Sequence, residues 1–245
     1  MGWLAALGGG AFVLASVVVS ARLLALALRT RELPELLVGL NLALSGALGY
    51  PVAIYARVVH DPALRAALQI LHGAMMVVGL TSVVIFNWRV FRPADAWARR
   101  LSIAYPAVLV ALFAWQTAAP GWAEFAKHTS GPWRVLPYGT LFALGWAGIE
   151  SLLYYQKLRK RLALGLAEAV TTDRLRLWAI AMLAAFMTSL LVQVVRSMGV
   201  AMTGSVTGLI VGPLGIVSAS AMWLAFLPPQ RYVDWVLARA GTARA

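Results

Sequence analysis

Residues 3–28 read WLAALGGGAFVLASVVVSARLLALAL, and Arg22 is the only charged side chain among them. A helix that crosses the hydrocarbon core of a bilayer needs about 20 predominantly apolar residues, so this run is long enough to cross once. Its Ala, Leu and Val lack the strict alternation over about ten residues that is typical of a barrel strand. The run therefore predicts a transmembrane helix.

Six further apolar runs follow, and only 12% of the 245 residues are charged, against about 25% in an ordinary soluble domain. The seven predicted helices are Trp3–Leu28, Leu36–Val58, Ala66–Val90, Leu101–Ala119, Leu136–Tyr155, Leu177–Val200 and Val206–Leu227. We therefore expect an all-α integral membrane protein, a single seven-transmembrane-helix bundle over residues 1–245. No soluble domain of useful size is left.

The Lys and Arg residues fall unevenly on the two sides of this bundle. When alternate loops are assigned to opposite sides, fifteen of the 21 basic residues fall on one side and four on the other. The four are Arg57, Arg65, Lys127 and Arg134. Basic residues near helix ends stay in the cytoplasm. We therefore expect the N-terminus outside and the C-terminus in the cytoplasm.

The net charge of +12 has the same origin. The charge is spread over loop ends and forms no compact basic domain with interleaved aromatic residues, which argues against nucleic acid as a partner. The expected partner is the bilayer itself, whose anionic head groups on the cytoplasmic side attract each surface Lys or Arg by about 1 kcal/mol.

Two cytoplasmic segments are candidates for contact with other molecules. The loop from Gln156 to Arg176 begins with a basic run and continues with leucines. It either docks a cytoplasmic signalling partner or anchors the chain against lipid. The segment 228–245 follows Pro228-Pro229, and its aromatic and basic residues predict a short interfacial helix.

Several polar side chains should lie at similar depth toward the outer side of the bundle. They are Tyr50, Gln69, His72, Gln193 and Arg196. Gln193 and Arg196 are three residues apart, so they share one helix face. Together these residues could line an outward-facing pocket for a small polar or anionic ligand. The alternative is that Arg196 extends toward water and His72 is a packing residue.

Ionisable residues inside a bilayer are rare and are candidates for function by default. Arg22 and Glu150 should lie at similar depth toward the cytoplasmic side, so an Arg22–Glu150 ion pair would neutralise both. Glu150 is also the candidate for a proton site. The alternative is that Arg22 extends to the cytoplasm and Glu150 satisfies another neighbour.

The last predicted helix carries glycines at a spacing of four: Gly204, Gly208 and Gly212, the last followed by Pro213. Small residues at this spacing allow two helix backbones to approach closely. The pattern favours tight packing inside the bundle, with a homodimer face or a hinge as alternatives.

No cofactor is predicted. Retinal needs a lysine in the last helix, and the lysines Lys127, Lys157 and Lys160 all lie in loops. A bis-histidine haem needs two histidines within the membrane, and only His72 qualifies. No metal-ligand spacing connects the three histidines, and the chain has no cysteine. GxSxG, HExxH and P-loop motifs are absent, so an enzyme is disfavoured but not excluded.

Two stretches, Arg159 to Trp178 and Trp223 to Trp235, resemble uncharacterised bacterial seven-helix inner-membrane proteins. The resemblance covers about 33 of the 245 residues. It implies a multi-pass protein of the bacterial inner membrane and carries no function with it.

The sequence thus leads to three functional hypotheses. The first is a sensor or receptor-like protein that binds a small ligand in the outward-facing pocket and signals through its cytoplasmic loops. The second is a small proton-coupled transporter that uses Glu150. The third is a structural or assembly role in the membrane.

Overall fold

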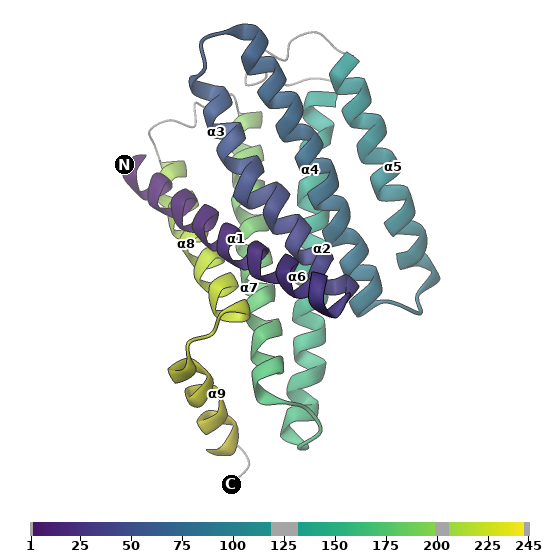
Figure 1. Cartoon of the computed structure of the whole chain (residues 1–245), viewed down its shortest axis with the longest axis vertical. Coiled ribbons are helices and arrows are strands. Elements are labelled where there is room, and N and C mark those ends of the chain that lie inside the picture. Colours follow the sequence, from purple (N-terminus) through teal and green to yellow (C-terminus); the bar gives the residue numbers. More distant parts are fainter. Residues whose placement is uncertain (1, 119–131, 199–205, 243–245) are drawn as a thin grey trace.

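A computed structural model of the chain describes residues 2–118, 132–198 and 206–242. Over these ranges the chain is helical, with no β-strand (Figure 1). The helices are α1 Gly2–Thr30, α2 Leu33–Asn41, η1 Leu42–Gly49, α3 Tyr50–Val58, α4 Pro62–Phe91, α5 Ala96–Ala118, α6 Pro132–Ala163, α7 Ala169–Ser197, α8 Val206–Phe226 and α9 Gln230–Thr242.

Among the described residues, six helical segments are long and apolar enough to cross a membrane. They are α1, the continuous segment of α2, η1 and α3, and the helices α4, α5, α7 and α8. By length and composition the chain is therefore a multi-pass helical membrane protein. The fifth predicted crossing, Leu136–Tyr155, lies within α6, a helix of 32 residues that falls short in apolar character. Glu150 and Tyr138 are among the residues that lower its hydropathy.

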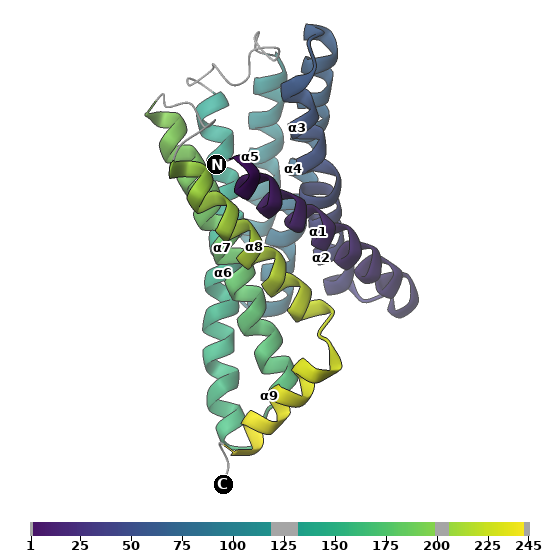
Figure 2. The same ribbon diagram turned by 90° about the vertical axis from the view of Figure 1, so that its left-hand side faces the viewer.

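The helices α1, α8, α7, α6 and α4 follow one another around the bundle, and the α2–η1–α3 segment closes the circuit between α4 and α1. Helix α5 lies outside this circuit, against α4 and α6 (Figure 1). Because α1 packs on α8, the first and last long helices are neighbours, and they cross the bundle at a steep tilt (Figure 2).

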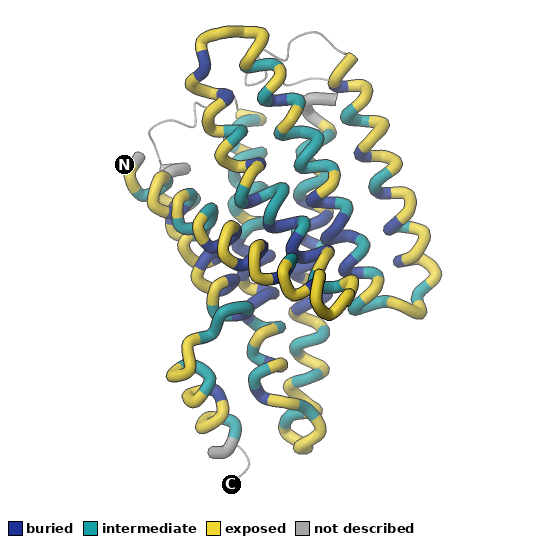
Figure 3. Tube along the Cα trace, viewed as in Figure 1, coloured by how far each residue is buried: buried dark blue, intermediate teal, exposed yellow. Residues whose placement is uncertain are grey.

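The buried residues gather at mid-height between the helices (Figure 3). Val19, Val83 and Ala181 are fully buried there. Large apolar side chains also lie on the outer surface, where Leu14 is 67% and Ile103 62% exposed. A soluble protein would hide such a surface, whereas a bilayer is as apolar as these side chains. The outward faces are therefore suited to lipid.

The second crossing contains π-helix, in η1, which ends two residues before Pro51. Proline lacks an amide hydrogen, and its ring clashes with the carbonyl four residues earlier, so the wider π turns accommodate it. Small residues fit this segment between its neighbours. Gly46 lies against Ser16 of α1, and Gly79 of α4 lies against Ser45.

Helices α6 and α7 extend beyond the other helices at the lower end of Figure 1, and α9 lies beside them (Figures 1 and 2). We call this part, residues 155–176, the lower hairpin. Its turn contains Gly165, which has a φ of +73°, a conformation that glycine adopts without strain. Helix α7 begins at Ala169, eight residues before the predicted start at Leu177. The charged first turns of α7 are thus helical although they are too polar for a bilayer.

Candidate functional site

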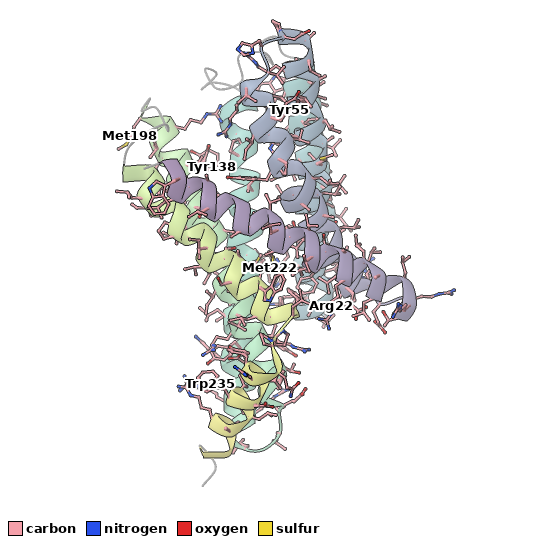
Figure 4. All side chains as sticks on the ribbon, turned by 60° about the vertical axis from the view of Figure 1, so that its left-hand side comes forward. Arg22, Tyr55, Tyr138, Met198, Met222 and Trp235 are labelled. Carbon is pink, nitrogen blue, oxygen red and sulfur yellow. The ribbon has the colours of Figure 1, made fainter. Side chains whose placement is uncertain are left out.

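Three basic side chains from different helices gather at the upper end of the bundle, where Figure 4 shows Tyr55 and Met198. Arg57 is on α3, His72 on α4 and Arg196 on α7. The positive charge of Arg57 acts on both His72 and Arg196, which places the three groups within electrostatic reach of one another. We call them the upper cluster. Basic groups on three helices make this end electropositive, which favours a nearby anion.

His72 also has a structural contact. Its Nδ1 lies 3.0 Å from the carbonyl oxygen of Gly49 in η1. A carbonyl oxygen only accepts hydrogen bonds, so Nδ1 donates and Nε2 is the acceptor of the neutral ring. His72 therefore ties α4 to η1 immediately before Pro51.

The other predicted pocket residues are distributed differently. Gln193 is half-buried on α7, one turn from Arg196, and Gln69 is buried on α4. Tyr50 instead belongs to the contact with α1, because its ring meets Phe12 edge-on at 6.3 Å between centroids. A side chain at Gly9 of α1 would also collide with the Tyr50 ring.

Glu150 pairs with Arg92, and the predicted pair with Arg22 is wrong. The Nε of Arg92 donates to both carboxylate oxygens of Glu150 at 3.0 Å. Trp146, one turn earlier on α6, donates its Nε1 to the same carboxylate at 3.3 Å. Arg22 is exposed on α1, which packs on α2, η1 and α8, whereas α6 packs on α4, α5 and α7.

The Glu150 pair belongs to a larger contact at the start of α5. Arg92 also donates to Asp95 at 3.3 Å, and its guanidinium lies 5.8 Å from the ring centre of Trp97. Trp97 in turn packs on Trp146 with centroids 5.8 Å apart. These contacts fasten the α4–α5 turn to α6. The carboxylate of Glu150 is therefore engaged in holding three helices together.

The glycines of α8 that the structure describes face α1. A Cβ at Gly212 would lie 2.6 Å from the carbonyl oxygen of Leu4, and one at Gly215 would lie 3.0 Å from that of Gly8. The two backbones are thus in direct contact inside the chain. Helix α8 continues through the exposed Pro213. Gly204 and the surroundings of Gly208 lie outside the described residues.

A cavity of about 530 Å³ lies at the opposite end, between the lower hairpin and α9. Its lining includes Arg159 of α6, Arg176 of α7 and Arg239 of α9, together with Tyr155 and Trp235. We call it the arginine groove. Figure 4 shows Trp235 on α9 at this end. Volumes of about 300–1,000 Å³ are typical of sites for small molecules.

A small hydrogen-bond network seats α9 on α7. The Tyr232 hydroxyl donates to one oxygen of Asp173 at 2.6 Å, and Arg176 pairs with the other at 2.6 Å. Partial burial, together with the hydrogen bond to Asp173, raises the pKa of Tyr232. The neutral phenol is therefore the form that holds α9 in place.

Alkaline pH should release α9. Because the folded state raises the pKa of Tyr232, this stabilisation is fully present below the ordinary tyrosine pKa of about 10 and is lost as pH rises through the raised value. We expect the anisotropy of a dye on Leu237→Cys to fall in that range. Tyr232→Phe should lack the pH step and loosen α9 by about 1 kcal/mol at neutral pH. An identical alkaline step in Tyr232→Phe would contradict the assignment.

Sequence reasoning missed Arg92 as the partner of Glu150 and missed the arginine groove. Arg92 follows the predicted end of a helix, where a basic residue is ordinary, so no local signal singled it out. Arg159 and Arg176 were noted only as members of a basic loop. The sequence offered one signal for the groove. Tyr232 in the last segment is an amphipathic residue next to charged ones, and such a residue favours a polar contact with another segment.

The described residues contain no group of three or more His, Asp and Glu that could hold a metal ion. The function must therefore be argued from the geometry of this chain, because comparison with known protein families, curated proteins and solved structures finds no match.

Proposed function

We propose that the chain crosses a bacterial inner membrane seven times, with its N-terminus outside and its C-terminus in the cytoplasm. The crossing that we add to the six apolar segments is α6, the fifth in chain order, which packs on α4, α5 and α7. Six crossings without α6 would place both ends on one side and would weaken the asymmetry of basic residues from fifteen against four to thirteen against six. The bacterial location rests on the sequence resemblance. The upper cluster is then external, and the lower hairpin and α9 are cytoplasmic.

Within this topology, the protein is a receptor-like sensor that binds a small anionic ligand at the upper cluster. One observation carries the proposal: α7 is a single helix that contains Arg196 near its upper end and Asp173 and Arg176 at its lower end. Arg196 lies 23 positions after Asp173, which is about 35 Å along the helix at 1.5 Å per residue. A displacement of one end is therefore transmitted to the other.

Ligand binding supplies a reason for such a displacement. Arg57 and Arg196 carry like charges, so an anion bound between them would attract both and draw α3 and α7 together. Helix α7 contacts α8 through a buried hydrogen bond from Ser218 to the carbonyl oxygen of Ala181 at 3.0 Å. Movement of α7 is therefore passed to α8 and to α9, where a cytoplasmic signalling partner would read it.

The binding step is tested with purified protein titrated with sulfate, phosphate and succinate while the thermal unfolding midpoint is followed. One of these anions should raise the midpoint. Arg57→Gln and Arg196→Gln should each weaken that anion roughly tenfold or more, because a hydrogen bond to a charged group contributes about 1.5–3 kcal/mol. Arg100→Gln, an exposed position on α5, makes the same charge change and is the control. Equal affinity in all four proteins would overturn the proposal.

Transport through Glu150 receives less support. A proton-coupled carboxylate has to exchange its proton with a water pathway, and both oxygens of Glu150 accept hydrogen bonds from Arg92. A homodimer through the glycines of α8 also receives less support, because Gly212 and Gly215 face α1 of the same chain.

A further inference from the structure

The arginine groove is built from three segments that are distant in the sequence. Arg159 comes from the end of α6, Arg176 from the start of α7 and Arg239 from α9. The surface they share is the wall of one cavity of about 530 Å³. Three arginines on the wall of one cavity, with Asp173 as the only acidic residue among the described residues that line it, make the groove electropositive.

The acidic group in the groove is already engaged. Asp173 accepts from Tyr232 and pairs with Arg176. Arg159 is exposed at the edge of the groove, whereas the Nε of Arg176 is buried without a hydrogen-bond partner. The buried Nε of Arg176 is a donor with unused hydrogen-bonding capacity, which points to a ligand with acceptor oxygens.

The groove also has an apolar side, formed by Leu162, Val236 and Ala240 among others. Along α6, Arg159 lies nine residues beyond Glu150, about 13 Å further from the bundle core. The groove therefore lies well outside the buried centre of the bundle (Figure 3). A ligand with a charged head and a less polar body fits such a wall.

We infer that the arginine groove binds a phosphate-bearing ligand, with its phosphate held by Arg159 and Arg176 and its body against Leu162 and Val236. The planar guanidinium fork matches the oxygen geometry of phosphate, which makes arginine the preferred residue for this task. Two sources supply the same chemistry: the head group of an anionic phospholipid, or a soluble phosphate ester in the cytoplasm. The inference does not depend on ligand binding at the upper cluster.

The chain contains no cysteine, so a single introduced cysteine can be labelled specifically with a dye. Leu237→Cys, at an exposed position on α9, gives a single site for an environment-sensitive dye. In one arm, protein in phosphatidylcholine nanodiscs is titrated with pyrophosphate and with glycerol 3-phosphate. In the other arm, the nanodiscs contain increasing fractions of phosphatidic acid. A saturable dye response in either arm is expected, and the arm that responds identifies the source.

The variant Arg159→Gln should weaken that response roughly tenfold or more, since it removes a charge-assisted contact. It leaves the Asp173, Arg176 and Tyr232 contacts intact, so α9 stays seated. Arg161→Gln is the matched control, because Arg161 is exposed on the same helix end and does not line the groove. Equal responses in the two variants would overturn the inference. A control titration with a polyglutamate peptide would also overturn it if that peptide, and none of the phosphate-bearing ligands, produced a response. Arg57 and Arg196 are unchanged throughout, so the result is independent of the proposed sensor function.

Discussion

Replacing Gly212 by leucine should strongly destabilise the folded protein. A Cβ at this position would lie 2.6 Å from the carbonyl oxygen of Leu4 and 2.7 Å from its carbonyl carbon. These atoms belong to the backbone of α1 and cannot rotate away, so the two helices must separate. Overpacking a core costs about 1–3 kcal/mol when side chains can adjust, and we expect at least the upper part of this range. The measurement is the thermal unfolding midpoint and the monodisperse yield in mild detergent.

Gly10→Leu is the matched control for this prediction. Gly10 lies on α1 within one turn of Gly8, but it is exposed, and no atom lies within 4 Å of the position that its Cβ would occupy. A leucine there enters lipid and should leave the unfolding midpoint nearly unchanged. If Gly212→Leu and Gly10→Leu behaved alike, the close contact between α1 and α8 would be wrong.

Replacing Arg92 by leucine should have the second largest effect. It leaves the carboxylate of Glu150, whose side chain is only 9% exposed, with Trp146 as its remaining donor. Breaking a buried ion pair by removing one partner costs about 3–5 kcal/mol. We expect a smaller loss, of about 2–3 kcal/mol, because the Arg92 side chain is 30% exposed and solvent screens the pair.

The reverse substitution should be milder. Glu150→Leu leaves Arg92 with Asp95 and access to water, so the double variant should be more stable than Arg92→Leu alone. The measurement is a double-mutant cycle on the free energy of unfolding. Additive effects of the two substitutions would show that the pair contributes nothing.

Much of the helical architecture could be predicted because it follows from local composition. Runs of about 20 apolar residues have to be helical in a bilayer, where every backbone amide needs a partner within the segment. The ends were less predictable. Helices α6 and α7 continue into polar sequence, where hydropathy falls but helix formation does not stop. The same polarity leaves α6 outside the six segments that composition identifies as crossings.

The pairing of side chains could not be predicted, since it depends on which helices are neighbours. Arg22 and Glu150 were matched by depth, but depth does not determine lateral position, and α4 rather than α1 packs on α6. The π-helix before Pro51 was not predicted either, because a proline disturbs the preceding turn without determining whether that turn bends or widens. Helix spacing did place Gln193 and Arg196 on one face, since both belong to a single helix.

The most direct test of the sensor account measures whether the two ends of α7 are coupled. Spin labels on Leu164→Cys and Leu237→Cys report the distance between the lower hairpin and α9. The background carries Arg159→Gln, which weakens anion binding in the arginine groove. An anion concentration just sufficient to occupy the upper cluster should shift the distance distribution, and adding Arg196→Gln should strongly reduce the shift at that same concentration. An anion that binds the upper cluster and leaves the distribution unchanged would contradict the account.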